Sequence, residues 1–136
     1  RERDELKIVD DQVGAPTWAR LLAEVTSQMV AQHASPLCRE AIPISDVSGI
    51  YHAVPAGSTS WHGFAARILE NGAGRAGQKP PKLVPIPTSD YPLPAVRPRN
   101  SRLSTEKLTR TFGLAAPSWE DSLAMCLQEM HGTPVA

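Results

Sequence analysis

Residues 6–17 read LKIVDDQVGAPT and carry the pattern of a short strand that passes through a tight turn into a helix. The first four are β-type residues, and Gly14 and Pro16 are turn formers that end the extended run. Thr17 is a candidate N-cap, because a threonine hydroxyl can accept a hydrogen bond from the first turn of a following helix. We therefore expect the amide donors of the turn, Gln12 and the Thr17 hydroxyl to converge at one place.

The rest of the chain alternates short extended runs with helices. The expected elements are a helix from 17 to about 33, a strand over 49–54, a helix from 61 to about 71, an edge strand over 83–86 that contains Pro85, a helix over 104–112 closed by Gly113, and a helix over 119–130. The expected hydroxyl caps are Ser60, Ser104 and Ser118. The expected apolar stripes are Leu21, Leu22, Val25, Met29 and Val30 in the first helix, Phe64, Ala65, Ile68 and Leu69 in the second, and Leu123, Cys126 and Leu127 in the last.

The prolines and the short strands favour a small lobe over a complete nucleotide-binding domain. The chain has 13 prolines, and Pro92, Pro94 and Pro98 predict a stiff, mostly extended loop over 88–100. A complete doubly wound domain would show longer and more apolar strands. We therefore predict an α+β fold, a single domain of short strands and about four helices over residues 1–136, which is about one domain's length.

Composition excludes several partners. The 136 residues carry 14 basic and 14 acidic side chains, so no net charge favours nucleic acid or a membrane surface. No apolar run approaches the roughly 20 residues of a membrane span, and no signal-peptide pattern is present. Cys38 and Cys126 occupy different sequence contexts, which favours reduced thiols over a disulfide. A cytoplasmic location is expected, with neither nucleic acid nor membrane as partner.

The motifs of nucleotide-dependent catalysis are missing or misplaced. Residues 72–77 match G-x-G-x-x-G, but a predicted helix precedes them and Lys79-Pro80-Pro81 follows, the reverse of a phosphate-binding context. Neither Tyr51 nor Tyr91 has a lysine four residues on, and the four histidines lack metal-ligand spacing. We expect no catalytic residue, no cofactor-binding residue and no metal ligand in this chain.

Three segments are candidates for a binding site. Residues 10–17 place amide donors at a helix start, which favours an anion, although a turn with a cap explains the same pattern. Trp61 falls in the first turn of a helix and is either a stacking surface or a core aromatic. Residues 97–103 hold three arginines in a proline-stiffened loop; guanidinium groups bind phosphate well, but exposed arginines are commonly only solvated.

At these segments the chain resembles the dTDP-4-dehydrorhamnose reductases. Residues 9–17 are similar to the D-Q-x-G-x-P-T signature of that family, and Gly49-Ile50-Tyr51-His52 with residues 60–65 is similar to its next block. Residues 85–95 lead into Arg97-Pro98-x-Asn100-Ser101-Arg102-Leu103, again as in the family, and Ser118-Trp119 precedes the last helix. The resemblance runs in order from about Leu6 to Met130.

The resemblance implies the C-terminal substrate-binding part of an extended short-chain dehydrogenase/reductase. The family reduces dTDP-4-dehydro-L-rhamnose to dTDP-L-rhamnose with NADPH or NADH, for surface polysaccharides, and carries its catalytic residues on an N-terminal Rossmann domain that is absent here. The implied partners are therefore a dTDP-sugar, that Rossmann domain and a second copy in a homodimer. The substrate-binding residues implied by the matching segments are Gln12, Gly14, Pro16, Thr17, Trp61, Arg97, Asn100 and Ser101.

One departure from the family concerns a metal. Some members bind magnesium through glutamates at a dimer interface; Glu129 matches one of these positions, but Arg20 stands where another glutamate is expected. Because a guanidinium cannot ligate a cation, we predict no metal here and a pairing of Arg20 with an acidic group, Glu129 included. An alternative from another class is a non-catalytic regulatory module, as in relatives that regulate methionine adenosyltransferase.

Overall fold

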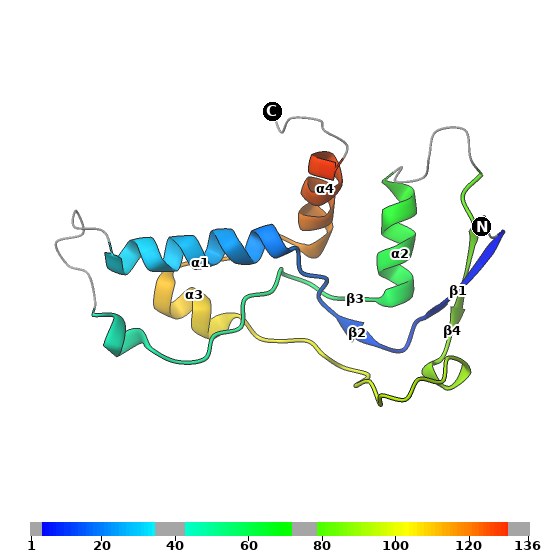
Figure 1. The fold of residues 1–136 in the computed structure, drawn as a ribbon, viewed down its shortest axis with the longest axis horizontal. Helices are drawn as coiled ribbons and strands as arrows, with labels where there is room; N and C mark the ends of the chain where they lie inside the picture. The colour runs from blue at the N-terminus through cyan, green and yellow to red at the C-terminus, as the bar shows by residue number, and fades with distance from the viewer. Residues whose placement is uncertain (1–3, 35–42, 72–78, 131–136) are drawn as a thin grey trace.

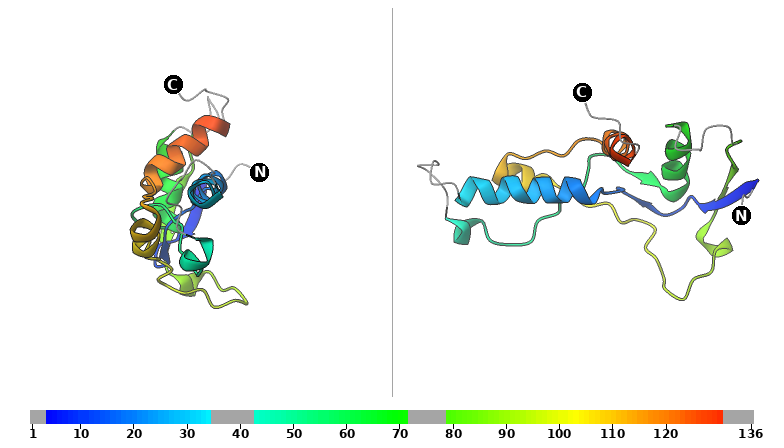
Figure 2. Two further views of the ribbon diagram at one scale, coloured as in Figure 1. Left: turned by 90° about the vertical axis from the view of Figure 1, so that its left-hand side faces the viewer. Right: turned by 45° about the horizontal axis from the view of Figure 1, so that its top comes forward.

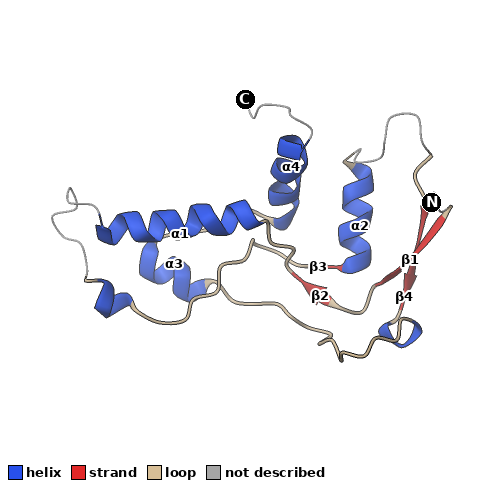
Figure 3. Cartoon of the chain, viewed as in Figure 1, coloured by secondary structure: helices blue, strands red, loops and turns tan. Residues whose placement is uncertain are grey.

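The computed structural model describes residues 4–34, 43–71 and 79–130. Its elements in chain order are β1 (Glu5–Val9), β2 (Val13–Gly14), α1 (Ala19–Ala34), a 3-10 turn (Ile44–Val47), β3 (Thr59–Ser60), α2 (Trp61–Glu70), β4 (Lys82–Ile86), a second 3-10 turn (Thr88–Asp90), α3 (Glu106–Phe112) and α4 (Trp119–Met130). The fold is thus mixed α and β, with four helices in the described part, as predicted (Figure 3). Cys38 and the glycine motif at 72–77 lie outside the described residues.

The described parts form an elongated and open body (Figure 1). β1 and β4 form a parallel pair at one end, with Glu5 opposite Lys82 and Val9 opposite Ile86, and α2 packs beside them. α1 and α3 lie together at the other end, and α4 stands between the two ends (Figures 1 and 2). No further strand pairs with either edge of this two-stranded sheet in the described chain.

The main core lies between α1 and α3. Leu21 and Val25 of α1 pack with Leu108 and Phe112 of α3, and Tyr51 meets the Phe112 ring edge-on at 5.0 Å between centroids. The buried apolar residues of the described chain are Leu21, Val25, Leu108, Phe112, Trp119 and Leu123. The fully buried apolar core of the described residues is small for a chain of 136 residues.

Two predicted stripes are only partly buried. In α1, Leu22 and Val30 are 39% and 52% exposed, whereas Leu21 and Val25 are buried. In α2, the predicted stripe is half-buried throughout, and no residue of that helix is fully buried. The α2 stripe is nevertheless in contact with its surroundings, since α2 packs beside β1 and β4 and the Phe64 ring meets the Trp119 ring.

The predicted strand over 49–54 is wrong. The described chain has no ladder there, and Ile50 is 83% exposed. The Tyr51 hydroxyl donates to the carbonyl of Val47 at 2.7 Å, and Lys107 donates to the carbonyl of Ile50 at 3.0 Å. This segment is held by a helix and a turn instead of a neighbouring strand.

The predicted caps have mixed outcomes. Ser60 accepts from the Gly63 amide at 3.0 Å and Ser118 accepts from the Asp121 amide at 3.0 Å, so both predictions are confirmed. The Thr17 cap is wrong: α1 begins at Ala19, and the Thr17 hydroxyl donates back to the Ala15 carbonyl at 2.9 Å.

The third helix begins and ends close to its predicted bounds. The N-cap position is Thr105, one residue after the predicted cap Ser104, and the Thr105 side chain makes no capping hydrogen bond. The Ser104 hydroxyl accepts a hydrogen bond from the Glu106 amide at 3.3 Å. Gly113 ends the helix at φ 67°, as predicted, since glycine enters the left-handed region without a Cβ penalty.

Candidate functional site

The three candidate segments meet around Val13. β2 pairs antiparallel with β3, with Val13 opposite Ser60. On the other side, the Val13 amide donates to the Arg99 carbonyl at 2.8 Å, and the Ser101 amide donates to the Val13 carbonyl at 2.9 Å. Backbone hydrogen bonds therefore fix the segment before α2 and the arginine loop against the turn that follows β1.

At Gly14 the turn that follows β1 and the arginine loop lie very close to each other. A Cβ at Gly14 would lie 2.6 Å from the Ser101 Oγ, closer than real side chains approach. The Ser101 hydroxyl itself donates to the Val13 carbonyl at 3.1 Å. The glycine thus allows the arginine loop to lie directly on the turn.

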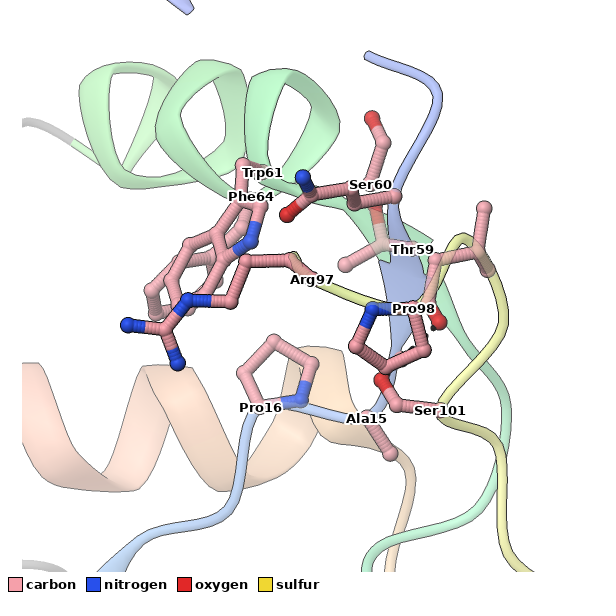
Figure 4. Close-up of a pocket in the computed structure, with 12 residues that line it drawn as sticks. Ala15, Pro16, Thr59, Ser60, Trp61, Phe64, Arg97, Pro98 and Ser101 are labelled. Carbon is pink, nitrogen blue, oxygen red and sulfur yellow. Dashed lines mark hydrogen bonds between the residues drawn. The ribbon is translucent and has the colours of Figure 1, made fainter. Parts of the chain in front are cut away.

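A cleft of about 300 Å³ opens at this junction (Figure 4). Its lining residues are Gln12, Val13, Gly14, Ala15, Pro16, Thr59, Ser60, Trp61, Phe64, Arg97, Pro98 and Ser101. We call it the junction cleft. In the close-up, the Arg97 side chain extends between Trp61 and Pro16. Trp61 is 58% exposed, so the core alternative for this tryptophan is wrong and its ring is available for contact.

Arg97 differs from its two neighbouring arginines. Arg99 Nε lies 3.9 Å from Asp11 Oδ2, and Arg102 Nε donates to Asn100 Oδ1 at 3.0 Å. Within the described residues no hydrogen bond or ion pair engages the Arg97 guanidinium, which lines the cleft. It is therefore the cation of this loop that remains available to an anion.

A second groove, of about 790 Å³, adjoins the first and shares Gln12, Trp61 and Arg97 with it. Its other walls are β1 and the proline-rich loop, contributed by Lys7, Ile8, Val9, Thr88, Ser89, Tyr91, Pro92, Leu93, Ala95 and Val96. Trp61 and Arg97 therefore stand between a smaller cleft and a wider groove.

Two aspartates tie the end of β1 to its surroundings. Asp11 accepts from the Thr88 amide at 2.8 Å and from the Thr88 hydroxyl, and Gln12 donates to the same hydroxyl at 3.1 Å. The hydrogen bond from the Thr88 side chain is the main reason why the pKa of Asp11 lies below its ordinary value of 3.8. Asp10 accepts from the Ser60 hydroxyl and so anchors the first turn of α2 beside Trp61.

The cleft brings together six of the eight predicted residues: Gln12, Gly14, Pro16, Trp61, Arg97 and Ser101. Two lie outside its lining. Thr17 lines a neighbouring cleft, and the Asn100 side chain is engaged by Arg102, although its backbone bridges to Val13. Six further residues line the cleft and were not predicted individually: Val13, Ala15, Thr59, Ser60, Phe64 and Pro98. Each lies within three residues of a predicted one, which is the signal available.

Arg20 forms the predicted contact with Glu129. Its Nη1 lies 3.1 Å from Glu129 Oε2, and its Nε donates to Glu24 Oε1 at 2.9 Å. These two carboxylates raise the pKa of Arg20. The ion pair joins the first turn of α1 to the last turn of α4.

The described residues supply no cluster of three or more histidine, cysteine or carboxylate side chains that could hold a metal ion. None of the described helices is both long and apolar enough to cross a bilayer. The junction cleft combines a guanidinium that no described residue engages, that of Arg97, with the exposed indole of Trp61, and these groups suit an anionic ligand with a ring or sugar attached.

Comparison with known proteins gives a consistent set of relatives. The family described as RmlD substrate binding domain matches residues 1–131. A dTDP-4-dehydrorhamnose reductase from Burkholderia thailandensis is 44% identical over 133 residues, covering 96% of this chain and 43% of the relative. The chain therefore spans about two fifths of the length of this curated relative.

Solved structures agree with the sequence comparison. A crystal structure of a dTDP-4-dehydrorhamnose reductase from Clostridium acetobutylicum matches with a TM-score of 0.75 and 30% identity, over 94% of this chain and 39% of that one. A second, from Bacillus anthracis in complex with NADP, matches with a TM-score of 0.72 and 26% identity, over 93% and 39%.

Proposed function

Because the chain belongs to the RmlD substrate binding domain family, we propose that it is the substrate-binding part of a dTDP-4-dehydrorhamnose reductase, which reduces dTDP-4-dehydro-L-rhamnose to dTDP-L-rhamnose. The observation that carries the proposal is the junction cleft, where six predicted residues meet around an unpaired Arg97. Family membership names the ligand class, and the cleft supplies donors of the required kind. The protein is an oxidoreductase component in the cytoplasm, in the pathway to surface polysaccharide.

The diphosphate is the ligand group that Arg97 suits best. A guanidinium presents paired N–H donors to phosphate oxygens, and two such bonds fix orientation as well as charge. Pro98 stiffens the loop, and the Val13–Arg99 and Val13–Ser101 bonds hold it, so little order is lost when the anion binds. Arg97 therefore grips the diphosphate, and Ser101 and the Gly14–Ala15 backbone complete its surroundings.

Trp61 is assigned to the rest of the ligand. Its indole is exposed at the boundary of the two clefts, and Ser60 and Asp10 hold the helix turn that carries it. Aromatic side chains bind rings and sugars through large flat contact areas at a low entropy cost. In this arrangement Trp61 orients the sugar or base and shields it from water.

Hydride transfer needs a nicotinamide, NADPH or NADH, and this group would supply the reducing equivalent. The described residues provide no strand–glycine loop–helix unit to hold it, so we assign its binding and the acid–base residues to an N-terminal Rossmann domain. The Bacillus anthracis neighbour was solved with NADP, which supports a nicotinamide cofactor in the parent reductase. This chain binds and orients the substrate. The same proposal includes a homodimer, in which two copies of the reductase associate.

A titration with three ligands tests the proposed site. The chain should release or absorb heat with dTDP, less strongly with dTMP, and not with thymidine, because the diphosphate makes the charged contacts. Equal binding of dTDP and thymidine would contradict the role given to Arg97. Turnover of the keto-sugar by the assembled reductase, and its absence in the isolated chain, distinguishes an enzyme component from a regulatory module.

A further inference from the structure

The side chain of Gln12 lies where the junction cleft and the second groove meet, and it lines both of them. The residue is half-buried in the turn that follows β1. Its Nε2 donates to the Thr88 hydroxyl oxygen at 3.1 Å. A side-chain amide has a donor end and an acceptor end of nearly the same shape. The end that remains for the ligand therefore decides which kind of ligand group Gln12 can bind.

The Thr88 hydroxyl determines the orientation of this amide. A hydroxyl has one proton, and Thr88 donates it to Asp11 Oδ1, which also accepts from the Thr88 amide at 2.8 Å. The hydrogen bond from the Thr88 side chain holds the pKa of Asp11 below its ordinary value of 3.8. Near neutral pH the carboxylate is therefore ionised and can only accept. The Thr88 oxygen is left as an acceptor.

An acceptor at Thr88 can face only the NH2 group of Gln12. In the opposite orientation, the Gln12 and Thr88 oxygens would meet as two acceptors with no proton between them. The amide is therefore fixed with its Nε2 toward Thr88, and its Oε1 is the end that remains. None of the hydrogen bonds within residues 4–34, 43–71 and 79–130 engages this oxygen.

The neighbours of Gln12 in the site supply the opposite polarity. Trp61 and Arg97 line the same two clefts, and an indole and a guanidinium can only donate hydrogen bonds. An ionised diphosphate has only acceptor oxygens, so it suits Arg97 and does not suit the Gln12 carbonyl. The Gln12 Oε1 is thus placed to bind a different part of the ligand, one that carries an N–H or O–H group.

We propose that Gln12 is a specificity-determining residue, whose carbonyl oxygen accepts a hydrogen bond from an uncharged donor of the ligand, and that Thr88 and Asp11 are positioning residues that orient it. The inference rests on the proposed function, because a dTDP-sugar offers such donors in the thymine N3–H, the deoxyribose 3′-hydroxyl and the hydroxyls of the sugar. A ligand without the matching donor leaves the Gln12 oxygen unpaired and binds less tightly.

Four ligands identify the donor, since each differs from dTDP in one group or one sugar: dTDP, its N3-methyl form, its 3′-deoxy form and dTDP-L-rhamnose. The 136-residue chain is titrated with each by calorimetry. Loss of the donor that Gln12 accepts should weaken binding roughly two- to tenfold, the effect of one net hydrogen bond. The variant Q12A should abolish the difference for that ligand pair and leave the other differences unchanged.

The outcomes separate this inference from the proposed function. If the wild type binds none of the four ligands, the proposed function fails, and the inference fails with it. If the wild type binds them but every difference between ligands persists in Q12A, the inference alone is overturned. An equal loss for all four ligands in Q12A would also overturn it, because Gln12 would then not recognise a particular donor.

The variant T88V tests the positioning role, because valine keeps the shape of threonine and lacks the hydroxyl. T88V should reduce the same ligand difference, and T88S should restore it. The double variant Q12A/T88V should bind no more weakly than Q12A, because Thr88 acts through Gln12; additive losses would overturn the positioning role. T109V is the matched control: it removes a hydroxyl that donates to the Leu114 carbonyl at 2.9 Å, away from both clefts, and should change none of the affinities.

The NH2 group of Gln12 provides a measurement that needs no variant. Its nitrogen relaxation should report a rigid side chain on the picosecond-to-nanosecond timescale, whereas the exposed Gln28 on α1 should be mobile. Equal mobility of the two groups would overturn the positioning role. Circular dichroism and thermal unfolding show whether the variants fold. If T88V does not fold, the relaxation of Gln12 and the titrations of Q12A decide.

Discussion

Replacement of Arg97 by alanine is the most direct test of the proposed contact between this side chain and the diphosphate. The side chain lines the junction cleft, is exposed, and engages no other described residue by hydrogen bond or ion pair. Its removal should therefore change the free energy of unfolding by less than about 0.5 kcal/mol, the usual range for such surface positions. Any large loss of affinity is then a property of the site and not of the fold.

The size of the effect follows from the contacts that Arg97 can make. A hydrogen bond to a charged group contributes about 1.5–3 kcal/mol, and the Arg97 side chain is exposed to water, so the lower half of this range applies. About 1.5–2 kcal/mol corresponds to a rise of roughly 12- to 30-fold in Kd for dTDP or in KM for the dTDP-sugar. R97K should raise Kd and KM by an intermediate factor, because lysine keeps the positive charge but lacks the paired N–H donors of the guanidinium.

The assay is steady-state oxidation of reduced nicotinamide by the reductase that contains this chain, with dTDP titrations of the chain alongside. Only KM should rise, with kcat within about twofold, since the contact is made equally in ground and transition states. R99A is the matched control: this arginine is two residues away, faces Asp11 at 3.9 Å and does not line the cleft. Equal losses in R97A and R99A would refute the reasoning, since general loop charge would then explain both.

Three further predictions concern stability. R20A should lower the free energy of unfolding only slightly, because the side chains of both Arg20 and its partner Glu129 are half-exposed. A double-mutant cycle with E129A measures the coupling, and a coupling of zero would contradict the contact. The depressed pKa of Asp11 means that its hydrogen bonds to Thr88 stabilise the fold above the ordinary pKa of 3.8 and lose this effect as the pH falls through the lower folded value. The stability difference between wild type and T88V should therefore begin to shrink as the pH falls below about 4 and be smallest below the folded pKa of Asp11. A constant difference at all pH values would count against it. G113A should lower the free energy of unfolding by about 1 kcal/mol, because alanine is strained in the left-handed backbone conformation of this residue and nothing lies within 4 Å of the added Cβ. Thermal or denaturant unfolding measures the change, and an unchanged midpoint would contradict the prediction.

Local sequence signals predicted the helices well. Each predicted helix is present, because its apolar spacing and a nearby hydroxyl or glycine specify it without reference to distant residues. Ser60, Ser118 and Gly113 act as predicted. The Thr17 cap failed because the preceding turn engages its hydroxyl first, through the Ala15 carbonyl.

The strands were harder to predict, because a strand needs a partner that the local sequence does not reveal. The run at 49–54 has strand-forming residues, but Tyr51 packs on the Phe112 ring and the backbone finds no ladder in the described chain. β2 and β3 have two residues each, too few for any periodic pattern, and their pairing builds the site.

The site was predicted in part for the same reason. The three segments singled out in the sequence supply Gln12, Trp61 and Arg97, and all three residues line the same cleft. The hydrogen-bond partners of the side chains could be identified only from the structure. Asn100 resembled a ligand contact in the sequence, but its amide is used by Arg102. Trp61 looked like a core residue on general grounds, and only the open packing of α2 leaves it exposed.

A titration of the chain with dTDP, followed by amide and indole resonances, tests the central claim most directly. We predict saturable shifts at Gln12, Gly14, Ala15, Ser101 and the Trp61 indole, and none at the α1–α3 core around Leu108. Shifts that are absent from the junction cleft, or that are spread evenly over the surface, would contradict the assignment of this cleft as the dTDP-sugar site.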